Sequence, residues 1–269
     1  MWVEVMSYYI SYWGISHIGN VRKMNQDNLV CGKKYKNIRK NSFSTYSIKS
    51  SKENLLLGIF DGMGGGECGE IASYIAAQNA VSFQTRANVI SNIKTLCQKS
   101  DADISEYAKK NDIFSMGTTA AMLLFTKKSI VLCNIGDSKI FRFAQGKMEQ
   151  ISKDHVAIAA CGVKPPLSQY LGASISNLVI DPYLAQGSYD KRDVYLICSD
   201  GLTDMVSLKE ISDILSLNQP KDAIDLLLKR ALENGGKDNI SIIICKIEGL
   251  FDYLVNKIIL GGKKESYEN

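Results

Sequence analysis

Histidine is almost absent from this chain, and its scarcity removes one large class of sites. Only His17 and His155 occur among 269 residues, so chemistry built on a histidine cluster is excluded. The seven cysteines are odd in number and contain no C-x-x-C pair, which excludes a zinc knuckle and a thioredoxin-type site. Cysteines within apolar stretches behave as small hydrophobic residues, and this usage predicts a cytoplasmic protein.

Long apolar runs, proline and strong net charge are also missing. No run reaches the roughly 18–20 residues that a membrane span requires. Residues 1–10 carry Glu4 and no Lys or Arg, so we expect no secretory signal in them. The formal charge of +4 is too small to indicate nucleic acid as a partner. Four prolines and 45% hydrophobic residues indicate a folded globular chain with enough apolar side chains for one large core or two small ones.

Short apolar runs rich in β-branched or aromatic residues predict the strands. They are Leu55–Phe60, Ala120–Phe125, Ile130–Ile135, Ile140–Phe143, Val194–Cys198 and Ile240–Cys245, with a hairpin turn at 144–147.

Helical periodicity occurs in separate segments, at 71–81, 89–97 and 224–231. Ser207 to Glu210 has the sequence of a capping box that opens a further helix. Gly235-Gly236 ends the helix that finishes near Glu233. Strands and helices that fall in separate runs predict an α+β fold of antiparallel sheets covered by helices. We expect one domain over residues 7–248 and a tail over 249–269 that forms a short helix and is then disordered.

Acidic residues fall at the ends of the predicted strands. Asp61, Asp137 and Asp200 follow strands, and Asp238 precedes the last one. If that strand is antiparallel to its partners, the four carboxylates gather at one end of the sheets, where Asp27 can join them. Repulsion between such groups calls for a divalent cation, and an all-oxygen ligand set selects Mg²⁺ or Mn²⁺. The alternative is that Asp-Gly and Asp-Asn are ordinary turn dipeptides.

Six motifs then occur in a known order. They are Arg22-x-x-Asn25-Gln26-Asp27, Asp61-Gly62-Met63-Gly64-Gly65, Gly117-Thr118-Thr119, Gly136-Asp137-Ser138, Ser199-Asp200-Gly201-Leu202 and Asp238-Asn239. Together they resemble the bacterial PP2C (PPM) metal-dependent serine/threonine phosphatases over roughly residues 11–247.

The resemblance implies an α/β/β/α sandwich with two Mn²⁺ or Mg²⁺ ions in a cleft, and a third in bacterial members. It implies that Asp61, Asp200 and Asp238 bind the first ion, and that Asp61 bridges to the second. The second ion also takes the Gly62 carbonyl and reaches Asp27 through water.

The resemblance further implies that Asp137 binds the third ion and that Arg22 holds the substrate phosphate. A water or hydroxide between the two ions then attacks phosphoserine or phosphothreonine directly. The expected partners are phosphorylated proteins and an opposing serine/threonine kinase, and the expected state is a monomer.

Three positions depart from the pattern of the family. Gly66 stands where the family has His, and Lys139 stands where it has Arg after Gly-Asp-Ser, which affects a supporting contact. The segment between Asp154-His155 and Leu171-Gly172 is shorter than the family's flap. These departures keep open an alternative, a pseudophosphatase that binds phosphopeptides as a regulatory module.

Two further patterns carry weaker hypotheses. Gly64-x-Gly66-x-x-Gly69 matches the dinucleotide fingerprint, but no acidic residue follows at the required distance near Val89, so a metal-site turn is favoured. The basic segment 33–52 is interpreted as a solvated hairpin extension, with attraction of acidic or phosphorylated partners as the alternative.

Overall fold

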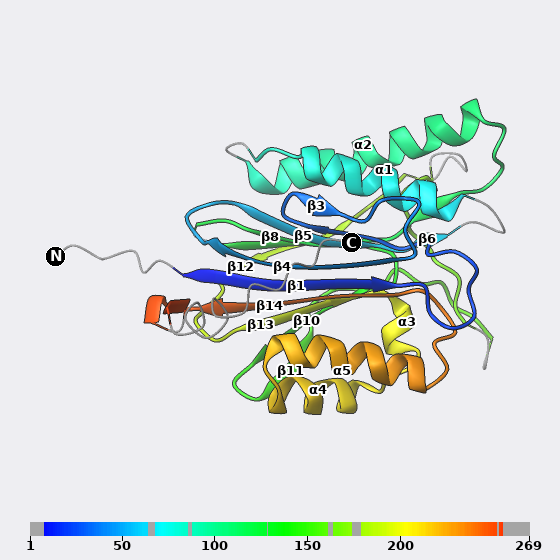
Figure 1. Cartoon of the computed structure of the whole chain (residues 1–269). Coiled ribbons are helices and arrows are strands. Elements are labelled where there is room, and N and C mark those ends of the chain that lie inside the picture. Colours follow the sequence, from blue (N-terminus) through cyan, green and yellow to red (C-terminus); the bar gives the residue numbers. More distant parts are fainter. Residues whose placement is uncertain are drawn as a thin grey trace.

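The computed structural model describes residues 8–63, 68–85, 88–127, 129–160, 164–173, 179–251 and 253–254. Two six-stranded sheets pack face to face, and helices cover the outer face of each (Figure 1). The strand pairs within both sheets are antiparallel. This four-layer arrangement confirms the predicted α+β sandwich.

The first sheet has the strand order β11-β10-β13-β14-β1-β4. Its strands are β1 (Tyr9–His17), β4 (Ser42–Ser50), β10 (Lys139–Ala144), β11 (Lys147–Gln150), β13 (Val194–Cys198) and β14 (Ile240–Glu248). The turn between β10 and β11 places Gln145 and Gly146 at positive φ, as a two-residue hairpin turn requires. The predicted hairpin at 144–147 is therefore confirmed.

The second sheet has the order β12-β9-β8-β5-β2-β3. Its strands are β2 (Asn28–Cys31), β3 (Lys34–Tyr35), β5 (Leu55–Phe60), β8 (Ala120–Phe125), β9 (Ile130–Ile135) and β12 (Tyr183–Gly187). A separate two-stranded ladder joins β6 (Gly62–Met63) to β7 (Gly117–Thr118).

Both faces of the central strands are buried, which explains their continuous apolar sequences. In β5, Leu55, Leu57 and Ile59 belong to the core between the sheets. Leu56 and Phe60 belong to the core beneath the first helix pair.

That helix pair is α1 (Gly69–Ser82) and α2 (Val89–Lys110), which covers the second sheet. The first sheet is covered by α4 (Leu208–Leu217) and α5 (Pro220–Glu233), with the short α3 (Asp200–Thr203) beside them. Ser207 caps α4 by accepting from the Glu210 N–H, as predicted. The Glu210 carboxylate pairs with Arg230 instead, so only half of the capping box forms.

Two long strands were not predicted, and one interpretation is wrong. β1 and β4 contain serine, tyrosine and Gly14, which interrupt the apolar run that marks a strand. The basic segment 33–52 is not a solvated hairpin. Its two strands lie in different sheets: β3 belongs to the second sheet, whereas β4 pairs with β1 in the first. Within it, Lys36 is completely buried.

The antiparallel pairing decides where the strand ends lie. β5 and β9 are both antiparallel to β8, so they run in the same direction and their carboxyl ends lie at the same end of the second sheet. β13 and β14 are antiparallel, so the end of one lies beside the start of the other. The last strand, β14, is therefore antiparallel to its partners, which is the condition under which the four carboxylates are expected to gather.

The chain beyond β14 begins as a helix at residues 250–251 and 253–254, and the Tyr253 ring stacks on Tyr9 at 3.8 Å. Residues 255–269, the rest of the predicted tail, lie outside the described residues. No helix in the part of the chain that the structure describes is long and apolar enough to cross a membrane.

Candidate metal and phosphate site

Asp61 is held at the end of β5 by the neighbouring strand. Its backbone N–H donates to Thr119 Oγ1 at 3.0 Å, and its carbonyl accepts from Thr118 Oγ1 and the Thr119 N–H, each at 2.9 Å. Three hydrogen bonds to the Gly117-Thr118-Thr119 motif thus fix the backbone on either side of the Asp61 carboxylate.

Gly62 lies where two segments of backbone meet. A Cβ at this position would lie 2.2 Å from the Gly69 carbonyl oxygen and 2.4 Å from that of Gln26. Only glycine permits this close approach, which brings the start of α1 and the Asn25–Asp27 motif against the end of β5. The next residues, Gly64 to Glu67, lie outside the described residues, and so does the predicted Gly66 departure.

Asp27 is a fully buried acid between the two sheets. Its carboxylate accepts a hydrogen bond of 2.9 Å from the Oγ of Ser199, which is the residue just before Asp200. Burial, together with the charges of Asp200 and Asp238, raises the pKa of Asp27 to about 7. The buried Lys36 is close enough for its charge and that of Asp27 to act on each other, yet burial outweighs this attraction and the pKa of Asp27 stays raised.

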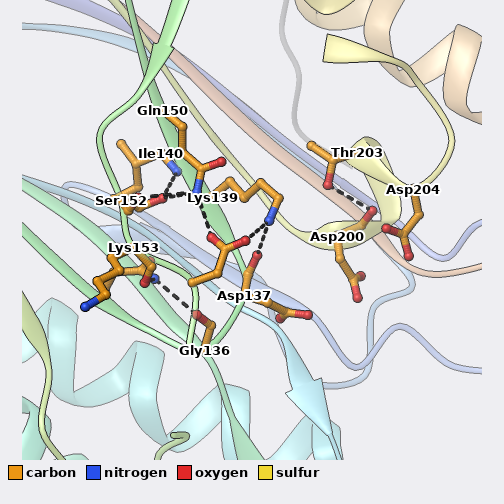
Figure 2. Close-up of polar contacts among 12 residues, drawn as sticks. Gly136, Asp137, Lys139, Ile140, Gln150, Ser152, Lys153, Asp200, Thr203 and Asp204 are labelled. Carbon is orange, nitrogen blue, oxygen red and sulfur yellow. Dashed lines mark hydrogen bonds and ion pairs between the residues drawn. The ribbon is translucent and has the colours of Figure 1, made fainter. Parts of the chain in front are cut away.

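Asp137 lies in the turn between β9 and β10, and its side chain projects toward Asp200 (Figure 2). Burial and then the charge of Asp200 raise the pKa of Asp137 to about 6. Lys139 forms an ion pair with Asp154 and donates to the Asp137 carbonyl at 3.4 Å. The lysine at this position therefore supports the turn, in line with the role predicted for it.

Two basic side chains contact the remaining predicted ligands. Arg22 Nη2 donates to Asp238 Oδ2 at 2.6 Å, so the predicted phosphate-binding group lies directly against a predicted metal ligand. Lys164 pairs with Asp200 and reaches Asp204 at 3.1 Å. Sequence reasoning missed Lys164 and Asp204, because no motif marks a lysine in the flap segment (155–171).

Asn239 links Asp238 to the loop that carries Arg22. Its Nδ2 donates to the carbonyls of Ile18 and Met24, and its Oδ1 accepts from the Gln26 N–H at 2.8 Å. Asp238-Asn239 thus anchors this loop. The sequence alone left that open, because Asp-Asn is also a common turn dipeptide.

The flap segment is tied to the same end of the sandwich. The His155 N–H donates to the Gly136 carbonyl, and Val156 pairs with Leu167. Leu171 and Thr118 exchange two backbone hydrogen bonds, so the far end of the segment joins β7. Residues 161–163, between these ends, lie outside the described residues.

The site is strongly acidic, and its charges act on one another. Burial and the charges of Asp27, Asp200, Asp137 and Asp238 raise the pKa of Asp61 well above its usual value. Within the described ranges, no three acidic, histidine or cysteine side chains are grouped closely enough to form a metal-binding cluster. Asp200 and Asp238 instead accept from Lys164 and Arg22.

These residues fit a hard divalent cation. The donors are carboxylate and carbonyl oxygens, the set that Mg²⁺ and Mn²⁺ prefer. Asp27 is fully buried, Asp61 is half-buried and their charges repel each other, and a cation between such groups would lower the pKa of both. The geometry brings the predicted residues to one end of the sandwich, while their individual roles as ligands stay a prediction.

A sequence profile described as protein phosphatase 2C matches residues 39–220, more than half of the chain. The chain belongs to the protein phosphatase 2C family. It is 27% identical over 221 residues to the serine/threonine protein phosphatase PstP of Mycobacterium tuberculosis, an alignment covering 77% of this chain and 43% of PstP. It thus spans less than half the length of that relative.

Other members of the family align over most of their length. The serine/threonine phosphatase stp of Listeria welshimeri is 26% identical over 228 residues, covering 77% of this chain and 90% of stp. The solved catalytic domain of PstP, described in complex with 2 manganese ions, has a TM-score of 0.73 and 23% identity, and the match covers 90% of this chain and 99% of that domain. At that identity the likeness shows the fold, which is that of the PP2C phosphatases.

Proposed function

We propose that this chain is a metal-dependent phosphatase that hydrolyses phosphoserine and phosphothreonine on proteins. The observation that carries the proposal is the convergence of Asp61 with Asp27, Asp200 and Asp238, whose charges act on one another at the end of the sandwich. The relatives named as serine/threonine phosphatases support the same reaction.

Each residue has a distinct part in the proposed reaction. Asp61, Asp200 and Asp238 would hold one ion. Asp61 and the Gly62 carbonyl would hold a second, which would reach Asp27 through water, and Asp137 would hold a third. When bound, the ions would supply an activated water for direct attack on phosphorus and would offset the charge of the phosphoryl oxygens.

Arg22 is placed to bind the substrate phosphate. Its side chain is half exposed and lies at the Asp238 side of the site. The planar guanidinium can donate two parallel hydrogen bonds to phosphate oxygens, a geometry that lysine lacks. Release of Arg22 from Asp238 would present this fork to an incoming phosphoryl group.

The test is phosphate release from a phosphothreonine peptide, with Mn²⁺ and with a chelator. We expect release that requires Mn²⁺ and that Asp200→Asn lowers at least a hundredfold while the circular dichroism spectrum is retained. Asp213→Asn, on the exposed face of α4, is the matched control and keeps full activity.

The pseudophosphatase alternative predicts a different outcome. Folded protein that binds the phosphopeptide but releases no phosphate in Mn²⁺ would replace the enzyme with a binding module. Unchanged activity in Asp200→Asn would instead show that the site is assigned to the wrong residues.

A further inference from the structure

Three basic side chains lie exposed beside the candidate site, and we call them the basic rim: Lys23, Arg39 and Lys40. None of the three has an ion-pair partner in the described portions of the chain. An ion pair would lower the attraction of these cations for a ligand, so the rim is electrostatically available.

The rim is built from two segments that are bound to each other. The buried Lys36 Nζ donates to the carbonyls of Asn25 and Lys40, each at 3.1 Å. Asn25 donates from its backbone N–H to Asn41 Oδ1 at 3.3 Å, and from Nδ2 to the Asn41 carbonyl at 3.1 Å. The segment 36–41 is therefore held against the loop that carries Arg22 and Asp27.

Strand register places the rim close to Asp238. His17, at the end of β1, lies opposite Ser42 of β4 on one side and Ile240 of β14 on the other. Adjacent strands are about 4.8 Å apart, so Ser42 and Ile240 are separated by about 10 Å. Lys40 precedes Ser42 by two residues and Asp238 precedes Ile240 by two, so both adjoin strands that begin at the same end of the sheet, two strand spacings apart.

A bound peptide would reach the rim with residues near its phosphorylated side chain. An extended chain advances about 3.3 Å per residue, so three residues cover the separation. The carboxylates of the site repel acidic side chains, whereas the rim attracts them where the peptide leaves the site.

We propose that the basic rim selects phosphoprotein segments with acidic residues about three positions from the phosphorylated residue. This inference rests on the proposed function and names the substrate class of the same site. The rim acts on substrate capture and not on the reacting atoms, so it affects KM and leaves kcat unchanged.

The test compares phosphothreonine peptides that are identical except for Glu or Gln at the flanking positions. We expect the wild-type chain to favour the Glu peptide in kcat/KM, and the double variant Arg39→Gln/Lys40→Gln to lose about threefold to tenfold of that preference through KM. The double variant Lys109→Gln/Lys110→Gln, at the exposed end of α2, is the charge-matched control and keeps the preference. Because ion pairs between the rim and the peptide would be exposed to solvent, 0.5 M NaCl should abolish most of the preference for the Glu peptide.

Hydrolysis of p-nitrophenyl phosphate in Mn²⁺ separates failure of this inference from failure of the proposed function. Normal hydrolysis of this small substrate by both double variants, with no Glu preference in the wild type, would overturn the inference alone. If the chain hydrolyses nothing, the proposed function fails, and fluorescence anisotropy of the labelled peptides tests the rim directly. Equal Kd values for the Glu and Gln peptides would then overturn it.

Discussion

Asp101 shows how one buried side chain can hold the end of the flap segment. It lies on α2 and is 7% exposed, and its Oδ1 accepts from the N–H groups of Gly172 and Ala173 at 2.7 and 3.0 Å. The preceding residue, Leu171, pairs with Thr118, whose hydroxyl donates to the Asp61 carbonyl. A single carboxylate is thus linked through backbone to the centre of the site.

We expect Asp101→Ala to destabilise the protein by about 2–3 kcal/mol, because two buried N–H groups lose their acceptor. Asp101→Asn retains an acceptor oxygen at the same place and should cost less than half as much. Urea unfolding of the two variants measures the difference. Equal stabilities would show that the hydrogen bonds to Gly172 and Ala173 contribute little.

At the scale of the element, α1 approaches the second sheet through small side chains. Ala72, Ala76 and Ala80 are completely or almost completely buried in the core that contains Val30 and Phe60. The short side chains allow the helix to pack closely, which brings Gly69 at its start within reach of Gly62.

A larger side chain in this face should therefore force the helix outward. We expect Ala76→Leu to lower the free energy of unfolding by about 1–3 kcal/mol. It should also weaken Mn²⁺ binding, measured by calorimetry, because the Gly62 carbonyl moves with α1. Gln78→Leu on the exposed side of the same helix is the control, and an equal effect from it would rule out this packing explanation.

At the scale of the whole molecule, the acidic site is a source of instability when no cation compensates it. The pKa of Asp27 is raised to about 7, so the folded state binds a proton more tightly than the unfolded chain does. The stabilisation from this proton is complete below the unfolded pKa near 4 and is lost as the pH rises through about 7. Burial lowers the pKa of His17 and His155, so their contribution to stability rises with pH up to about 6.5, opposite to that of Asp27.

Comparison with Asp27→Asn measures the contribution of the Asp27 carboxyl together with its attraction for the buried Lys36. In chelator at pH 8 we expect Asp27→Asn to be more stable than the wild type, with an advantage that shrinks as the pH falls to 6. Saturating Mn²⁺ should reverse the order, because the wild type then gains binding energy that the variant lacks. Urea midpoints measured at each pH check this, and a difference that does not vary with pH would contradict it.

Much of the fold could be predicted because the core strands are apolar on both faces. Leu55–Phe60, Ala120–Phe125, Ile130–Ile135 and Val194–Cys198 have the predicted bounds. β1 and β4 could not be predicted, because their stability comes from pairing with each other and with β14 and not from a local apolar pattern. The same limitation hid Lys36, a lysine in a charged segment that the fold encloses.

The sequence by itself determined the kind of chemistry at the candidate site. With two histidines and no C-x-x-C pair, acidic residues at strand ends are the donors left for a metal. The six ordered motifs resemble the protein phosphatase 2C family, whose profile matches residues 39–220. Only the tertiary structure decided which groups meet. Strand register brings residues 36–41 against the Arg22 loop, and the flap segment brings Lys164 to Asp200. Contacts between residues so far apart in the chain depend on how the two sheets are paired and stacked, and local sequence carries no signal for them.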